Sequence, residues 1–236
     1  MINIKYLTKK YHKKTVVEIK DLVLDECQVV GLVGKNGAGK STFMKLISGK
    51  IRPSDADFTI LGEKPFNSVK VAKEVGYYSS EMQFAGEEII DIIDSYEVMY
   101  NDFSREKCLK LLEVYSIDTK KRVKDLSQGM KAIFIVCLAM SGQQKIVLLD
   151  EPTAFMDKNA RLLFTNLIKM EKKYPNRLIM ISTHLAEELE EVIDSCVVIE
   201  NGSLKCVDDK YDEETMLNIV NLEQIDKMAE VYTDEK

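Results

Sequence analysis

A glycine-rich segment between a buried strand and a helix constrains this chain more than any other part of its sequence. The run from Val29 to Val33 is short, apolar, rich in valine and followed by glycine, which is typical of a central strand. Residues 34–41 then read Gly-Lys-Asn-Gly-Ala-Gly-Lys-Ser and fit the pattern G-x-x-x-x-G-K-S. Beyond them, Phe43, Leu46 and Ile47 are spaced as one face of a helix. The sequence therefore predicts a strand, a glycine loop and a helix N-terminus in succession.

This arrangement is suited to holding phosphate groups. Glycines let the backbone N–H groups of a loop point inward, and the positive end of the following helix dipole attracts anions. We expect Lys40 to reach the β- and γ-phosphates of a nucleoside triphosphate and the Ser41 hydroxyl to ligate Mg²⁺. The predicted nucleotide-binding residues of this segment are Gly34, Lys35, Asn36, Gly37, Ala38, Gly39, Lys40, Ser41 and Thr42.

An acidic pair forms a second element of the predicted site. The apolar run from Ile146 to Leu149 ends in Asp150 and Glu151, and Asp150 stands 110 residues after Lys40. An acid at the end of a strand beside the loop is placed to hold Mg²⁺, directly or through water, so we expect this role for Asp150. Glu151 would then lie near the γ-phosphate. The two elements together predict binding of a nucleoside triphosphate with Mg²⁺.

Strand-like and helical patterns alternate along the chain and predict an α/β fold with a mostly parallel sheet and right-handed crossovers. The expected strands lie near residues 2–6, 16–19, 22–24, 29–33, 75–78, 146–149, 178–181 and 196–199. Helical periodicity follows Gly39, with Phe43, Leu46 and Ile47 on one face, and covers residues 159–173 and 186–193. An inserted helical subdomain is expected at about 87–139. The predicted division is one domain over 1–208 and a short acidic, weakly helical extension over 209–236.

Composition argues against several other classes of protein. The chain has 33 Lys and Arg against 39 Asp and Glu, a net charge of −6, which disfavours a nucleic-acid binder driven by bulk charge. Its longest apolar run, residues 132–140, is far shorter than the about 20 residues of a spanning helix, so no direct membrane insertion is expected. The polar N-terminus predicts a cytoplasmic protein. The five scattered cysteines suggest neither a disulfide framework nor a zinc site.

Between the two phosphate elements, Leu126-Ser127-Gln128-Gly129-Met130 resembles the signature of the nucleotide-binding subunits of ATP-binding-cassette (ABC) transporters, usually written Leu-Ser-Gly-Gly-Gln. Thr183-His184 is similar to the switch histidine of that family. Tyr11, 23 residues before Gly34, stands where the family keeps an aromatic ring that stacks on adenine. The resemblance covers about residues 2–207 and looks most like bacterial export-type cassettes.

The resemblance implies a P-loop NTPase core with an N-terminal antiparallel β subdomain and an inserted α-helical subdomain. It also implies that two subunits close head to tail, with ATP between the phosphate loop of one and Ser127, Gln128 and Gly129 of the other. Glu151 would orient or deprotonate the attacking water and His184 would contact the γ-phosphate. Asp157, in the D-loop, would couple the two sites. The implied partners are a second nucleotide-binding subunit, identical or different, and an integral membrane permease that holds the chain on the inner face of the membrane.

The sequence departs from the family pattern at several positions. Gln128 and Met130 replace a glycine and a glutamine of the signature, and Phe155 stands where the D-loop usually has a small residue. The glutamine expected three residues after Tyr77 is Ser80, with Gln83 three residues further on, so either could complete the metal site.

Two functions are therefore kept at this stage. The first is an ATP-hydrolysing subunit that powers an exporter of peptide, antibiotic or lipid. The second is a regulatory, weakly hydrolysing half of a heterodimeric transporter. Ser127 also has a structural interpretation, because serine is a good helix N-cap.

Overall fold

The computed structural model describes residues 1–25, 29–84, 88–100, 102–173, 176–184 and 189–208. Within these residues one nine-stranded sheet has the order β4-β1-β2-β9-β8-β3-β7-β6-β5. The strands are β1 (Ile2–Tyr11), β2 (Lys14–Leu24), β3 (Val29–Val33), β4 (Asp55–Ile60), β5 (Val75–Ser79), β6 (Ile146–Asp150), β7 (Leu178–Thr183), β8 (Ser195–Glu200) and β9 (Ser203–Asp208). The helices are α1 (Lys40–Ile47), α2 (Val69–Glu74), α3 (Ile89–Met99), α4 (Arg105–Val114), α5 (Gln128–Ser141) and α6 (Lys158–Glu171), with a 3₁₀ turn at Val123–Asp125.

The central strands form the expected parallel sheet. β3 pairs in parallel with β7 and β8, β7 with β6, and β6 with β5. In this register Ser79 lies opposite Asp150, and Asp150 lies opposite Ser182. Every residue of β3, β6 and β7 is buried, as their continuous apolar sequences predict. The carboxyl ends of these strands therefore meet at one edge of the sheet.

The N-terminal strands are antiparallel. β1 pairs with β2 and with β4, while β8 and β9 form a hairpin that joins this part to the parallel strands. The expected strands at 16–19 and 22–24 are one strand, β2, because Asp21 turns through a positive φ of 52° without ending the pairing. The expectations also missed β4, in which only Phe58 and Ile60 are buried.

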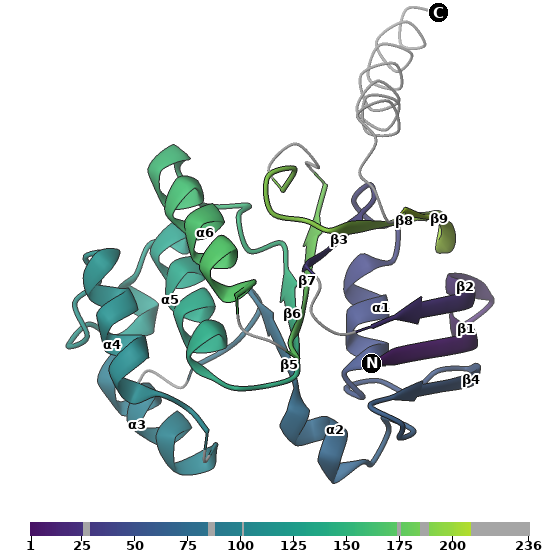
Figure 1. Ribbon diagram of the computed structural model, residues 1–236, viewed down its shortest axis with the longest axis horizontal. Coiled ribbons are helices and arrows are strands. Elements are labelled where there is room, and N and C mark those ends of the chain that lie inside the picture. Colours follow the sequence, from purple (N-terminus) through teal and green to yellow (C-terminus); the bar gives the residue numbers. More distant parts are fainter. Residues whose placement is uncertain (26–28, 85–87, 101, 174–175, 185–188, 209–236) are drawn as a thin grey trace, which may run out of the picture.

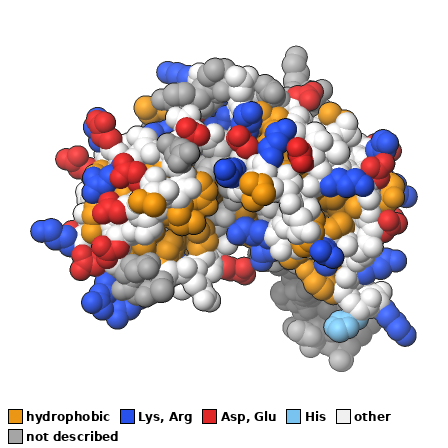
Figure 2. Space-filling view, turned by 90° about the horizontal axis from the view of Figure 1, so that it is seen from below, with side chains coloured by type: hydrophobic (Ala, Val, Ile, Leu, Met, Phe, Trp, Pro, Cys, Tyr) orange, Lys and Arg blue, Asp and Glu red, His pale blue; other side chains and the backbone are white. Residues whose placement is uncertain are grey.

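Two hydrophobic cores lie on opposite faces of the sheet. Helices α3 to α6 cover one face, and α1 lies on the other with β1, β2 and β4 beyond it (Figure 1). Ala132 to Ser141 of α5 are all buried, so this helix forms the centre of the helical layer. Seen from below, acidic and basic side chains are interspersed at the surface, and hydrophobic side chains show between them in both halves of the molecule (Figure 2).

The helical insertion contains the elements expected between residues 87 and 139. Ser104 and Ser127 cap α4 and α5, each accepting a hydrogen bond from the backbone three residues later. The division into domains at residue 208 stays a prediction, because 209–236 lie outside the described residues. In the part of the chain that the structure describes, no helix has both the length and the apolarity to cross a membrane.

The expected helix over 186–193 is wrong for its described part. Leu189 to Val192 form turns, in which the Leu189 carbonyl accepts from the N–H groups of Val192 and Ile193. The chain then has to enter β8 through Asp194, whose carboxylate accepts from the Val29 N–H at 2.9 Å. This hydrogen bond ties the start of β8 to β3. Residues 186–188 lie outside the described part of the chain.

Candidate nucleotide-binding site

The glycine loop joins β3 to α1 in a path that other residues would obstruct. Gly37 and Gly39 have φ of 80° and 109°, values that favour glycine. A Cβ on Gly34 would lie 2.3 Å from the Ile199 carbonyl oxygen, and one on Gly39 would lie 2.6 Å from that of Val16. The glycines therefore allow both the turn and the close approach of β8 and β2. The loop ends directly at the N-terminus of α1, as a phosphate-binding loop requires.

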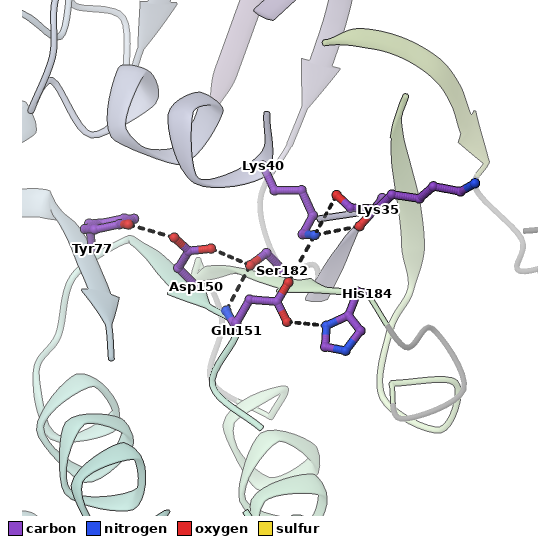
Figure 3. Close-up of polar contacts among 8 residues, drawn as sticks. Lys35, Lys40, Tyr77, Asp150, Glu151, Ser182 and His184 are labelled. Carbon is purple, nitrogen blue, oxygen red and sulfur yellow. Dashed lines mark hydrogen bonds and ion pairs between the residues drawn. The ribbon is translucent and has the colours of Figure 1, made fainter. Parts of the chain in front are cut away.

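The Lys40 side chain points into this loop and is only 6% exposed. Its Nζ donates to the carbonyl oxygens of Gly34 at 2.5 Å and Lys35 at 3.4 Å (Figure 3). The same ammonium forms an ion pair with Glu151 Oε1 at 3.0 Å, although without hydrogen-bond geometry. The carboxylate of Glu151 thus lies against the cation that the sequence assigns to the phosphates.

Two hydroxyl groups hold the carboxylate of Asp150. Tyr77 donates to Oδ2 at 2.7 Å and Ser182 donates to Oδ1 at 2.6 Å (Figure 3). Burial raises the pKa of the Tyr77 phenol well above its ordinary value, and the bond to Asp150 adds to this shift. Tyr77 therefore stays a neutral donor. Both donors come from strands that flank β6, which fixes the carboxylate at the edge of the sheet.

Glu151 has an uncommon backbone conformation. Its φ is 49°, a region that costs a residue with a side chain on the order of 1–3 kcal/mol. The Ser182 hydroxyl accepts a hydrogen bond from the Glu151 N–H at 2.9 Å and so stabilises this turn. Glu151 Oε2 lies 2.9 Å from Nδ1 of His184. The turn directs the carboxylate between Lys40 and His184.

The remaining loop residues and Tyr11 are more open. Asn36 and Ser41 are exposed, whereas Ala38 is buried against the core that contains α1. Tyr11 ends β1 and is 47% exposed, with Lys9 Nζ 5.0 Å from the centre of its ring. An exposed ring at this position is free to stack on a planar group.

The signature residues lie elsewhere, at the N-terminus of α5. Ser127 and Gln128 are exposed, and the Ser127 hydroxyl accepts from the Met130 N–H at 3.2 Å. A Cβ on Gly129 would lie 2.6 Å from the Phe155 carbonyl oxygen, so the glycine allows the D-loop to approach the signature. Asp157 caps α6 by accepting from the Ala160 N–H at 2.8 Å. The helix-cap interpretation of Ser127 is therefore confirmed, and the signature contacts the D-loop.

The structure places Ser80 and Gln83 just beyond β5. Ser79 pairs with Asp150 across the sheet, so Ser80 follows at the same edge. The Ser80 carbonyl accepts from Lys131 Nζ of α5 at 3.1 Å, which ties this segment to the signature helix. Both Ser80 and Gln83 are exposed. The choice between them as a metal ligand stays a prediction.

The donor set fits Mg²⁺ better than a transition metal. Asp150 and Ser41 supply the oxygen ligands that Mg²⁺ prefers, and each Asp150 oxygen keeps a lone pair beyond the bond it accepts. Within the described ranges, no group of three or more His, Cys, Asp and Glu residues could hold a metal ion. A site with one carboxylate and one hydroxyl suits an ion that keeps waters and binds substrate phosphates.

Sequence reasoning missed Tyr77 and Ser182 as site residues. Ser182 sits in the apolar run of β7, and its register with Asp150 is the signal that could have identified it. Tyr77 reaches Asp150 from β5, which neighbours β6 on the side opposite β7. Both act through the position of the Asp150 carboxylate.

Comparison with known proteins gives consistent results. A family model described as ABC transporter matches residues 18–154, more than half of the chain. YcbN of Bacillus subtilis, an uncharacterized ABC transporter ATP-binding protein, is 30% identical over 203 residues, which cover 84% of this chain and 66% of YcbN. The Nod factor export ATP-binding protein I of Rhizobium johnstonii is 31% identical over 209 residues, covering 85% and 67%. The cholesterol transporter ABCA5 of Rattus norvegicus is 36% identical over 220 residues, covering 87% of this chain but 13% of that protein.

Solved structures share the fold. An ATP-binding subunit of an ABC transporter matches with a TM-score of 0.77 at 22% identity, covering 88% of this chain and 89% of the other. A dimeric ATP-binding cassette bound to ADP and phosphate matches with a TM-score of 0.73 at 18% identity, covering 88% and 98%. The chain spans less than two thirds of the length of ABCA5 and just under two thirds of YcbN. On the family match and these relatives, the chain belongs to the ABC transporter family.

Proposed function

We propose that two copies of this chain, or one copy and a related subunit, bind ATP between them and hydrolyse it to power a separate membrane permease that exports its substrate. The single observation that carries this proposal is the row of contacts from Lys40 through Glu151 to His184. It places a cation, a carboxylate and an imidazole in series at the mouth of a glycine loop.

Each of these side chains has a task in phosphoryl transfer. Lys40 would exchange its contact with the Glu151 carboxylate for the β- and γ-phosphates of ATP, because both are anions competing for one ammonium. Glu151, still held by the Ser182 hydroxyl through its N–H, would then orient the attacking water. His184 would steady the charge that develops on the γ-phosphate.

Asp150 and Ser41 would hold Mg²⁺. When bound, the ion neutralises charge on the phosphate oxygens. Tyr77 and Ser182 orient the Asp150 carboxylate for this role by donating to its two oxygens. Whether Ser80 or Gln83 adds a ligand does not change the task of Asp150.

The outward position of the signature supports a dimer. Ser127 and Gln128 are exposed at the N-terminus of α5, where N–H groups and the helix dipole favour an anion. By the family resemblance, a nucleotide held by the phosphate loop of one subunit would meet this helix end on a second subunit. The fold shared with a dimeric cassette is consistent with this arrangement.

The proposal of export is based on the relatives and not on the geometry of the site. One relative is named for Nod factor export, which supports export, and another as a cholesterol transporter, which favours lipid among the proposed substrates peptide, antibiotic and lipid. The second candidate, a regulatory half of a heterodimer, is favoured by Ser80 and by the exposed Phe155 in the D-loop. Glu151 and His184, both present and in contact, favour the hydrolysing subunit.

Steady-state ATPase activity at increasing concentrations of the purified chain tests the proposal. If two copies form the complete sites, the rate of the wild-type chain rises faster than linearly with concentration and the Glu151→Gln variant stays inactive. If the wild-type chain binds ATP but is inactive at every concentration, the self-sufficient dimer is wrong. Adding candidate partner cassettes or the permease then separates the regulatory half from a subunit that needs its permease.

A further inference from the structure

The tip of the β1–β2 hairpin, residues 9–14, is strongly basic. It reads Lys-Lys-Tyr-His-Lys-Lys and so carries four lysines and no acid. The whole chain has a net charge of −6, which leaves −10 for all the other residues together. Lys10, Lys13 and Lys14 are exposed, and within the described part of the chain none of the three forms an ion pair. Because like charges held this close repel one another, the hairpin gains no stability from carrying them.

The acids of the neighbouring strands stop short of this tip. Glu18 of β2 and Asp55 of β4 both lie opposite Thr8, one residue before the tip begins. Lys9 donates to the carbonyl oxygen of Arg52 at 2.6 Å, and its Nζ lies over the ring of Tyr11, 5.0 Å from the centre. The exposed tyrosine that ends β1 therefore stands among cations.

The tip lies next to the phosphate loop. Tyr11 pairs with Lys14 at the start of β2, and Val16 follows two residues later. The carbonyl oxygen of Val16 would lie only 2.6 Å from a Cβ on Gly39, so β2 runs directly against the loop at this point. Two residues of extended chain span at most about 7 Å. Lys14 therefore begins within that distance of a residue that contacts the loop.

We propose that Lys10, Lys13 and Lys14 attract the polyphosphate of the nucleotide and speed its entry into the phosphate loop. This role depends on the proposed function, because it needs ATP to bind at residues 34–42. Charges of one sign gathered beside a site raise the association rate of a ligand of opposite charge. Lys40 would hold the phosphates inside the loop, so the exposed lysines of the tip would act on the approach of the ligand and not on the bound state.

A second basic segment, residues 120–124, is placed differently. It belongs to the helical insertion and is flanked in the sequence by Asp118 and Asp125. The Asp118 carboxylate accepts from the Lys120 N–H at 3.0 Å, so an acid is in contact with the start of this segment. Only the hairpin tip joins an unpaired group of lysines to a strand that contacts the phosphate loop, among the residues that the structure describes.

Stopped-flow mixing of the purified chain with N-methylanthraniloyl ATP tests the proposal. EDTA is present, so that Mg²⁺ does not mask the charge of the phosphates. With Lys10→Gln, Lys13→Gln and Lys14→Gln combined, the association rate constant should fall by about tenfold at about 20 mM salt. The difference should shrink to about twofold or less at about 500 mM salt, because such salt screens charges beyond about 5 Å. The dissociation rate constant should change by less than about twofold, and the loss should be smaller for the ADP analogue, which carries less charge.

Lys64→Gln, Lys73→Gln and Lys145→Gln combined are the matched control. They remove the same charge from exposed lysines, and Lys73 and Lys145 shortly precede β5 and β6, at the edge of the sheet opposite Asp150. This control should keep the wild-type association rate, as should arginine in place of the three lysines of the tip, which preserves the charge. Circular dichroism checks that every variant is folded.

The outcomes separate this proposal from the proposed function. Equal association rates for the wild-type chain and the neutralised tip at low salt would overturn it, as would an equal loss in the matched control, which would reflect net charge alone. Weaker binding that comes from faster dissociation would also overturn it, because the lysines would then hold the bound nucleotide. If the wild-type chain bound neither analogue, the nucleotide site itself would be wrong, whereas binding that ignores the tip would contradict only the role of these lysines.

Discussion

The two parts of the predicted ATP site are built in different ways. On the phosphate-loop side, Lys40 and Asp150 are each 6% exposed, and hydroxyl, carbonyl and carboxylate groups surround them. On the signature side, Ser127 and Gln128 are exposed, and the Ser127 hydroxyl accepts from the Met130 N–H of its own helix. Buried charges need partners in place, whereas an exposed helix end is satisfied by water until an anion arrives. The phosphate-loop side of the site therefore already has its protein partners in place, whereas the signature side is exposed to solvent.

Glu151→Gln is expected to have the largest effect, because it removes the carboxylate between Lys40 and His184 while keeping the size of the side chain. ATP hydrolysis should fall by about two orders of magnitude or more, with ATP binding retained and an ATP-dependent dimer stabilised. Turnover assays, calorimetric ATP titration and size-exclusion chromatography measure the three quantities. Glu190→Gln, at an exposed position outside the site, is the control. Unchanged turnover in Glu151→Gln would remove this carboxylate from catalysis.

Ser127→Arg tests the signature side of the site. A long cation at the end of α5 should block closure on a second subunit, so the ATP-induced dimer is lost and hydrolysis falls by about tenfold or more, while the single subunit still binds ATP. Ser95→Arg, at an exposed serine on α3, controls for the added charge. Ser127→Thr keeps a side chain able to cap the helix and should fold normally. A normal ATP-induced dimer in Ser127→Arg would contradict the assignment of the signature.

Tyr77→Phe tests the phosphate-loop side and is expected to have a smaller effect. Losing the hydrogen bond to Asp150 Oδ2 frees the carboxylate to rotate, so the Mg²⁺ concentration for half-maximal ATPase activity should rise by about tenfold. The maximal rate at saturating Mg²⁺ should change much less. Tyr78→Phe is the matched control, because Tyr78 packs in the helical layer on the other face of β5. Equal Mg²⁺ dependence in the two variants would show that Tyr77 does not position Asp150.

Local motifs made the phosphate-loop side predictable from the sequence. A few consecutive residues are enough to recognise the glycine loop with Lys40, and the same holds for the pair Asp150-Glu151. The helix after Gly39 begins where expected. His184 came from a resemblance, and the structure brings it to 2.9 Å from Glu151. Their catalytic roles stay predictions.

Contacts set by strand register were not predictable in this way. Ser182 and Tyr77 reach Asp150 because β7 and β5 flank β6. The order of strands in a sheet cannot be deduced from a single sequence. The missed strand β4 has a weak alternation. In the described part of the helix expected at 186–193, the chain forms turns before the hydrogen bond between Asp194 and Val29. In each case a tertiary contact outweighed the local pattern.

Alkaline pH should reveal the burial of Tyr78, on the helical face of β5, by the smallest of these effects. Burial raises the pKa of Tyr78 well above the ordinary value near 10, while the unfolded chain ionises at about 10. The neutral tyrosine therefore contributes fully to stability below pH 10, and this contribution is lost as pH rises above 10, by about 1.4 kcal/mol per pH unit for one such group. Urea unfolding between pH 9 and about 11 should show a shallower decline for Tyr78→Phe than for the wild-type chain. Equal slopes in the two proteins would show that Tyr78 ionises freely in the folded state.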